Sequence, residues 1–156
     1  MMASVSKEKA SPNIVELLRG GLDLKKDLVV EHAYKLDRKK ISAEEYERIR
    51  DELFAYLDEN CEVQDRYEYT IEEAPHEVVL YNCPIGKVGV YKASRPDGKY
   101  EVIHAEASET AWADVKDEAI MDIWHRLNEI VRPAEGNEEE LNQLMEDLYR
   151  IAELPN

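Results

Sequence analysis

The sequence has few of the residues that cross-link, anchor or activate proteins. Its 156 residues include two cysteines, four histidines and one phenylalanine. It has no run of about 18 apolar residues, the shortest stretch that is read as a membrane helix. Its first ten residues lack the apolar core of a signal peptide. We therefore expect a cytoplasmic protein that does not enter a membrane.

Two cysteines are too few for a disulfide framework. In a reducing compartment we expect Cys61 and Cys83 to be free thiols, which behave as small, half-buried apolar residues. They form a disulfide only if the fold brings them together, and the sequence alone does not show whether it does.

Catalytic motifs are also scarce. No Gly-x-Ser-x-Gly sequence is present, which would place a nucleophilic serine on a sharp turn. His104-Ala105-Glu106 is similar to the His-Ala-Glu element of zinc nucleoside deaminases. No cysteine follows Cys83, however, so the other zinc ligands of those enzymes are missing. We therefore predict no cofactor, no metal site and no catalytic residues.

One enzymatic alternative stays open. Two histidines and both cysteines fall in the region that we expect to form strands, namely His76, His104, Cys61 and Cys83. The fold could gather them into a metal site, or pair Cys83 with a histidine as a nucleophilic dyad. The protein would then be a small enzyme, or an accessory subunit of one, with a His/Cys site at the sheet.

Acidic side chains dominate the charge. The chain has 35 Asp and Glu against 20 Lys and Arg, a net charge of −15. Residues 1–40 contain nine basic and six acidic side chains, whereas residues 41–156 contain eleven and twenty-nine. Such a body repels nucleic-acid phosphates and attracts basic surfaces. We therefore predict a protein partner with a basic surface, and no direct binding of nucleic acid.

A second alternative rests on the basic side chains near the N-terminus. Six of them could contact a polyanion: Lys25, Lys26, Lys35, Arg38, Lys39 and Lys40. Few aromatic residues stand beside them, so base stacking would be weak. Nucleic-acid binding through this segment is therefore the less favoured interpretation.

Three helices are predicted before residue 60. Ser11-Pro12 has the chemistry of a helix start, and Gly20-Gly21 that of a helix end. Apolar residues spaced for one helical face predict a second helix from about residue 23 to 39: Leu24, Leu28 and Leu36. The Ser42–Glu45 capping box begins a third helix, to about Glu59, which would form an antiparallel hairpin with the second. Residues 35–57, through Ile41-Ser42-Ala43-Glu44-Glu45-Tyr46, resemble the short helical hairpins of the SHOCT type.

The middle of the chain changes from helical to alternating periodicity. Strands are predicted at residues 63–71, 76–83, 87–93 and 99–105, separated by turn sequences rich in Pro and Gly. Along the last strand, strict alternation would place Tyr100, Val102 and His104 on one face and Ile103 on the other. These strands describe an antiparallel meander.

Two more helices are predicted at the C-terminal end. Apolar residues recur at helical spacing from about Glu109 to Val131, on a face broad enough to contact two neighbours. Pro133 and Gly136 end this helix. Asn137, with Glu140 three residues later, is typical of a capping box that begins the last helix.

The expected fold is α+β, with an antiparallel three- to four-stranded meander and flanking helices. We predict a flexible tail at residues 1–10 and a single α+β domain at residues 11–156. Within it, residues 11–60 would form the N-terminal helices, 61–107 the β-meander and 108–156 the C-terminal helices. The sequence does not set an oligomeric state.

The function that the composition favours is non-enzymatic. We predict an adaptor, regulator or inhibitor that docks on a basic surface of a macromolecular partner, in one version by mimicking nucleic acid. Tyrosine suits interfaces because it combines a large contact area with a polar tip. The predicted partner-binding residues are sheet tyrosines and paired glutamates: Tyr67, Tyr69, Tyr81, Tyr91, Glu72, Glu73, Glu138 and Glu139.

Overall fold

A computed structural model describes residues 13–24, 26–27, 33–36, 39–130 and 136–155. The expected tail, the Ser11-Pro12 helix start and Pro133 lie outside the described residues. Within the described part, every helix is too short or too polar to cross a membrane.

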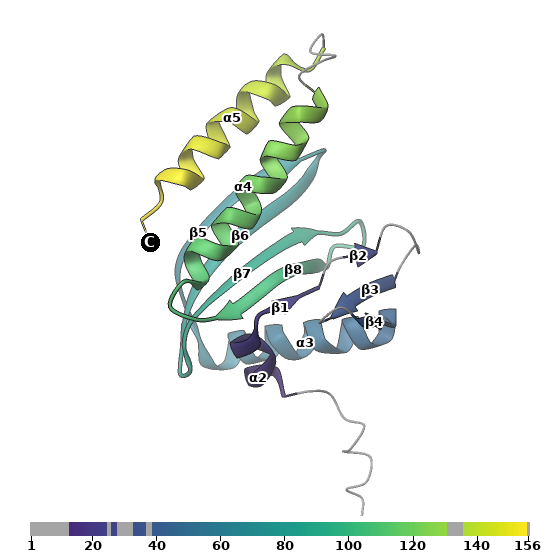
Figure 1. Cartoon of the computed structure of the whole chain (residues 1–156), viewed down its shortest axis with the longest axis vertical. Coiled ribbons are helices and arrows are strands. Elements are labelled where there is room, and N and C mark those ends of the chain that lie inside the picture. Colours follow the sequence, from purple (N-terminus) through teal and green to yellow (C-terminus); the bar gives the residue numbers. More distant parts are fainter. Residues whose placement is uncertain (1–12, 25, 28–32, 37–38, 131–135, 156) are drawn as a thin grey trace, which may run out of the picture.

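A five-stranded antiparallel sheet forms the centre of the molecule (Figure 1), in the order β1-β8-β7-β6-β5. Four of its strands make the predicted meander: β5 (Glu62–Ile71), β6 (Ala74–Cys83), β7 (Gly86–Ser94) and β8 (Tyr100–Ala107). The fifth, β1 (Leu22–Asp23), pairs with the outer edge of β8. The α+β class and the antiparallel sheet are therefore confirmed, with one more strand than expected.

The predicted second helix is wrong over the described residues. Strands occupy its place: β1, β2 (Lys26–Asp27), β3 (Ala33–Leu36) and β4 (Lys39–Ile41), the last three forming a small sheet. The helical hairpin with the third helix, which the SHOCT resemblance also implies, is therefore absent from the described part. Leu22 and Leu24 are buried on either side of the exposed Asp23, the alternation of a strand. The pairing of Leu22 and Asp23 with β8 outweighed the weak helical preference of this segment.

Helices cover both faces of the large sheet. Figure 1 shows α2 (Ile14–Gly20) and α3 (Ala43–Asn60) on one side, and α4 (Ala111–Ile130) and α5 (Glu138–Glu153) on the other. The third, fourth and fifth predicted helices are confirmed, with α3, α4 and α5 in their places. The first begins at Asn13, whose side chain accepts hydrogen bonds from the following turn, and ends at Gly21, where φ is 85°.

Each face of the sheet has its own hydrophobic cluster. The cluster under α2 and α3 includes Leu53, Val79, Val88 and Val90, and the cluster under α4 and α5 includes Val78, Tyr91, Ile123 and Ile151. Val78 to Tyr81 are all buried, so β6 is covered on both faces. This double burial explains why its sequence is the most continuously apolar of the meander.

A β-bulge interrupts the pairing of β7 with β8. Tyr91 pairs with His104, but Lys92 pairs with Val102, so Ile103 is an extra residue. The expectation that Val102 and His104 share a face is therefore wrong. Val102 packs in the cluster under α2 and α3, whereas His104 lies beside Glu118 of α4. A bulge redirects side chains in this way because it breaks the two-residue alternation.

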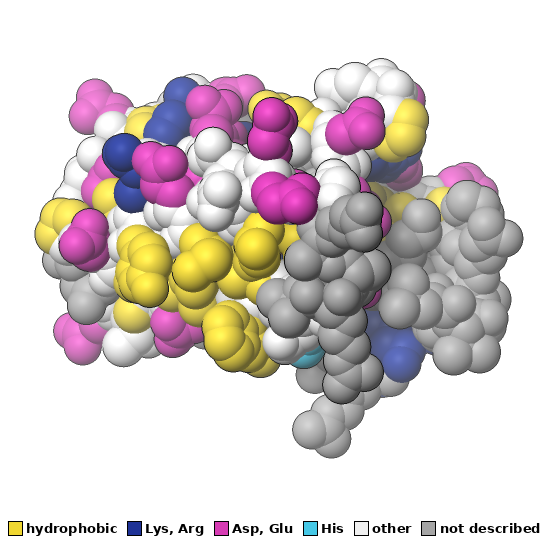
Figure 2. All heavy atoms as spheres, turned by 90° about the horizontal axis from the view of Figure 1, so that it is seen from above, with side chains coloured by type: hydrophobic (Ala, Val, Ile, Leu, Met, Phe, Trp, Pro, Cys, Tyr) yellow, Lys and Arg dark blue, Asp and Glu magenta, His cyan; other side chains and the backbone are white. Residues whose placement is uncertain are grey.

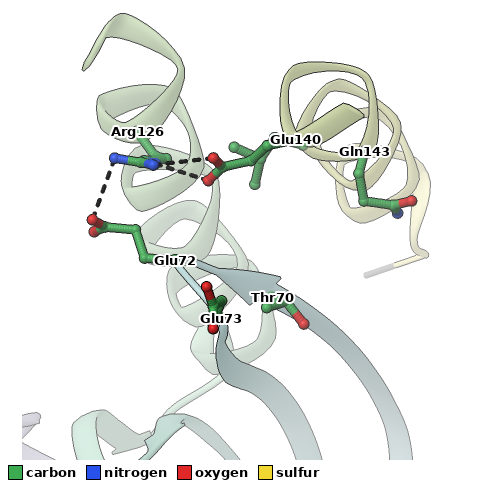
Figure 3. A pocket seen from close by; sticks show the side chains of 7 residues that line it. Thr70, Glu72, Glu73, Arg126, Glu140 and Gln143 are labelled. Carbon is green, nitrogen blue, oxygen red and sulfur yellow. Dashed lines mark hydrogen bonds and ion pairs between the residues drawn. The ribbon is translucent and has the colours of Figure 1, made fainter. Parts of the chain in front are cut away.

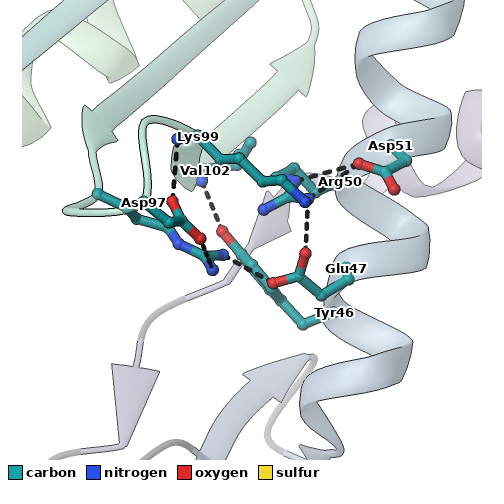
Figure 4. A network of polar contacts seen from close by, with 8 residues as sticks. Tyr46, Glu47, Arg50, Asp51, Asp97, Lys99 and Val102 are labelled. Atoms are coloured by element: carbon teal, nitrogen blue, oxygen red, sulfur yellow. Dashed lines mark hydrogen bonds and ion pairs between the residues drawn. The ribbon is translucent and has the colours of Figure 1, made fainter.

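Polar contacts fix α3 against the turn between β7 and β8 (Figure 4). The backbone N–H of Val102 donates to the buried Tyr46 hydroxyl at 2.7 Å. Glu47 forms ion pairs with Arg50 at 2.6 Å and with Arg95 at 2.7 Å. The hydrogen bond from Arg95 is the main reason that the pKa of Glu47 is lowered. The network holds the N-terminal half of the molecule to the sheet.

Candidate functional site

The sheet tyrosines do not form an exposed surface. Tyr69, Tyr81 and Tyr91 are 5%, 8% and 0% exposed, and Tyr67 is half-buried. Tyr81 packs in the cluster under α2 and α3, and the other three in the cluster under α4 and α5. These side chains pack into the core because helices cover their strands, so Tyr69, Tyr81 and Tyr91 offer a partner almost no surface.

Buried hydroxyl groups instead connect the sheet to the C-terminal helices. The Tyr91 hydroxyl donates to Asp122 of α4 at 2.7 Å and shares a hydrogen bond with the Tyr69 hydroxyl. The Tyr67 hydroxyl donates to the buried Asp147 of α5 at 2.8 Å. Burial is the largest cause that raises the pKa of all three tyrosines. They therefore act as neutral donors that position the two helices.

The predicted glutamates come from two segments, and the fold brings most of them to one end of the molecule. Glu72 and Glu73 form the turn between β5 and β6, and Glu138 and Glu139 begin α5. All four are exposed. Glu138 turns back to accept from the N–H of Gly136 at 3.0 Å. The other three line two hollows that share residues.

The first hollow is an acidic cleft between the β5–β6 turn and helices α4 and α5 (Figure 3). Its volume is about 570 Å³, and it is lined by Thr70, Glu72, Glu73, Arg126, Glu140, Gln143 and Leu144. Arg126 makes a bidentate pair with Glu140, at 2.8 and 3.0 Å, and lies 3.3 Å from Glu72. One cation from α4 therefore holds carboxylates from the turn and from α5.

A second hollow continues from this cleft along α5. It is lined by Glu139, Glu140, Asn142, Gln143 and Glu146. Among the described residues that line the two hollows, five are glutamates and one is an arginine. The cleft and its extension therefore have an excess of negative charge around side chains that can also donate and accept hydrogen bonds.

The turn that presents Glu72 and Glu73 has an unusual backbone. Their φ angles are 49° and 66°, and they are the positive-φ residues other than glycine in the described chain. A two-residue hairpin with positive φ at both positions favours Asn-Gly. A side chain in this region costs about 1–2 kcal/mol per residue. Two adjacent glutamates at these positions therefore carry a backbone cost that an Asn-Gly turn would avoid.

The His/Cys alternative is not supported by the geometry. Cys61 and Cys83 form a disulfide across the open end of the β5–β6 hairpin, so the expectation of free thiols is wrong. Both pack against the cluster under α2 and α3. His76, in contrast, lies between Tyr69 and Tyr91 under α4. The sheet separates the sulfur atoms from this histidine, and neither cysteine offers a thiolate.

Only some of the basic residues near the N-terminus lie in the described part of the chain. Lys35, Lys39 and Lys40 are exposed on β3 and β4, where Lys35 pairs with Lys40 across the strands. Lys25 and Arg38 lie outside the described residues, and so does the side chain of Lys26. The arrangement therefore leaves nucleic-acid binding by this segment as a prediction.

Sequence reasoning missed the residues that organise the cleft. Arg126 lies on the polar side of α4, and Glu140 fits a capping box with Asn137, so neither suggested a site. In the structure Glu140 pairs with Arg126 instead. No local pattern predicts this contact, because it joins side chains from two helices and a distant turn.

Comparisons with protein-family models, with curated proteins and with solved structures found no match for this chain.

Proposed function

We propose that this protein is a non-enzymatic adaptor, regulator or inhibitor that docks on a basic surface of a protein partner through the acidic cleft. The observation that carries the proposal is the convergence of Glu72 and Glu140 on Arg126. Glu73 lines the same cleft, and a second hollow beside it is lined by Glu139 and Glu146. Lysine or arginine side chains of a partner complement such a surface. Steering by the net charge of −15 speeds the encounter.

The surface beyond the cleft supports the same proposal. Viewed from above, Asp and Glu side chains are spread over the visible surface, while Lys and Arg occupy little of it (Figure 2). Exposed apolar side chains stand on the two helices that border the cleft: Met121, Trp124, Met145 and Tyr149. Aromatic and methionine side chains of this kind supply contact area at interfaces. Electrostatic attraction then selects the partner, and apolar contact strengthens the complex.

Nucleic-acid mimicry is one version of this function. Carboxylates spaced along the cleft and α5 would occupy a basic groove that otherwise holds phosphates. The proposal keeps the cytoplasmic location expected from the sequence, and the Cys61–Cys83 disulfide, a bond that reducing compartments disfavour, is the observation that speaks against that location. An inhibitor of this type competes with nucleic acid for its partner, which separates it from an adaptor that binds elsewhere.

Binding of an oligo-arginine peptide tests the proposal. We expect fluorescence anisotropy to show a complex whose affinity falls steeply as ionic strength rises from about 0.1 M to about 1 M, because the Debye length shortens from about 10 Å to about 3 Å. Replacing Glu72, Glu73 and Glu139 by glutamine should weaken this complex at least tenfold. The protein partner itself is then sought by affinity capture with both forms.

A matched control removes three charges elsewhere. Glu16, Glu59 and Glu62 are exposed and lie outside the cleft, so their replacement by glutamine changes the net charge equally. If the control weakens peptide binding as much as the cleft variant does, attraction is a property of net charge and the cleft is not the site. A partner that stays bound unchanged at about 1 M salt also contradicts the proposal.

A further inference from the structure

A different cluster of ionisable side chains lies at the opposite edge of the sheet, where β1 pairs with β8. Asp23 and His104 are direct partners across these two strands. Glu118 of α4 reaches the same place. One ring nitrogen of His104 and one carboxylate oxygen from each acid all lie within 4.8 Å of one another. Three elements thus bring three metal-binding side chains together.

The β-bulge is what turns His104 towards this cluster. Regular alternation would place His104 on the same face as Val102, in the apolar cluster under α2 and α3. The extra residue, Ile103, reverses the face, so the imidazole lies under α4. Bulges recur beside functional sites because they redirect one side chain without disturbing the strand order.

The two nitrogens of His104 have different environments. Nε2 lies 2.8 Å from Oε1 of Glu106, whose other oxygen accepts from the Ser108 hydroxyl. Nδ1 is buried and has no hydrogen-bond partner among the described residues. A buried polar atom without a partner is costly. With the proton on Nε2, held by Glu106, Nδ1 is the ring nitrogen that keeps a lone pair.

We propose that Asp23, His104 and Glu118 bind one divalent transition-metal ion. A carboxylate that accepts from the far nitrogen of a metal-bound imidazole is a recurring arrangement, because it sets the tautomer and strengthens the ligand. Imidazole together with carboxylates suits Zn²⁺, Mn²⁺ or Fe²⁺, whereas Mg²⁺ and Ca²⁺ prefer oxygen ligands alone. Three protein ligands leave a coordination position for water.

Zinc titration of the metal-free full chain tests the site. In excess Mg²⁺, which competes for weak carboxylate sites, calorimetry should show one Zn²⁺ per chain. His104→Ala and Asp23→Asn should each weaken binding at least tenfold. Glu106→Gln should weaken it about tenfold at unchanged stoichiometry, because it disturbs the orientation of the imidazole and not a ligand. His125→Ala is the control, since His125 is exposed on α4 and should change nothing.

Two further measurements keep the test decisive. Cobalt added to the wild type should give visible absorption bands that Asp23→Asn removes, and this substitution lies at an exposed position, so the variant should fold. Zinc should also raise the melting temperature of the wild type, because a ligand that binds only the native state stabilises it. Equal zinc affinity in the wild type, His104→Ala and Asp23→Asn overturns the proposal, as does the absence of tight binding to the wild type.

Discussion

Arg126 and Glu140 join α4 to α5 through two parallel hydrogen bonds, Nε to Oε2 at 2.8 Å and Nη2 to Oε1 at 3.0 Å. Their side chains are 20% and 28% exposed, so water screens the pair only in part. The same guanidinium reaches Glu72 at the β5–β6 turn. The pair therefore sets the spacing of the elements that border the acidic cleft.

Removing this cation should loosen the cleft. Arg126→Met is expected to lower the free energy of unfolding by about 1 kcal/mol, because a bidentate, partly shielded pair is stronger than an exposed one. Urea unfolding measures the change. The control is Arg150→Met, whose partner Glu146 and own side chain are 52% and 61% exposed, and it should lose less than about 0.5 kcal/mol. Equal losses would show that the bidentate geometry adds nothing.

Acid should weaken the same contact. Hydrogen bonds from Arg126 are the largest cause that lowers the pKa of Glu140 below its ordinary value of 4.5. A lowered folded-state pKa stabilises the fold above the unfolded pKa, and this contribution is lost as pH falls through the folded pKa. The stability difference between wild type and Glu140→Gln should therefore be constant near neutrality and shrink below pH 4.5. A difference that persists unchanged to about pH 2 contradicts the assignment.

Replacing the two glutamates of the β5–β6 turn should raise the stability of the protein and weaken its binding of the peptide. Asn-Gly suits the positive φ at positions 72 and 73 better than Glu-Glu does. This replacement should therefore raise the free energy of unfolding by about 1–2 kcal/mol. Loss of the ion pair between Glu72 and Arg126 should offset little of this gain in stability, because the Glu72 side chain is 64% exposed. The oligo-arginine peptide should meanwhile bind more weakly. A variant that is more stable and binds equally well would remove the functional reason for the strained turn.

The disulfide should contribute substantially to stability. Cys61 and Cys83 are 22 residues apart, and closing a loop of that length is worth about 3 kcal/mol in the chain-entropy model. The free energy of unfolding of the double variant Cys61→Ala/Cys83→Ala, measured with urea, should be lower than that of the wild type by about this amount. Dithiothreitol should destabilise the wild type similarly and leave the double variant unchanged. Alkylation of the unreduced, denatured wild type that labels both thiols would show that the disulfide does not form.

A close approach of β7 to α4 should make Gly89 intolerant of substitution. A Cβ there would lie 2.7 Å from the Ala111 carbonyl oxygen and 3.1 Å from Val115 Cγ2. Because the first of these atoms is backbone, Gly89→Ala should cost about 1–3 kcal/mol through displacement of α4. Gly20→Ala is the matched control, since no atom of the described residues lies within 4 Å of a Cβ added there, and thermal melting should show little change. A wild-type melting temperature for Gly89→Ala would refute the close packing.

Much of the fold was predictable from short-range patterns. The Ser42 cap, the Gly21 end of α2 and the apolar stripe of α4 each depend on residues within a few positions of one another. The antiparallel meander was predictable for the same reason, because turn residues separate alternating segments. Of the candidate site, the acidic residues at the β5–β6 turn and at the start of α5 were found, but not the cation that organises them.

The sequence by itself determined the α+β class, most helix and strand positions, and the acidic character of the chain, since local hydrogen bonding, side-chain periodicity and charge are properties of neighbouring residues. Tertiary structure decided what depends on distant partners. It made residues 22–23 a strand by giving them β8 to pair with, buried Tyr69 and Tyr91 under α4, and joined Arg126 to Glu140. It also placed Asp23 beside His104. Such contacts form only when chain segments far apart in the sequence lower their free energy together, so no local pattern contains them.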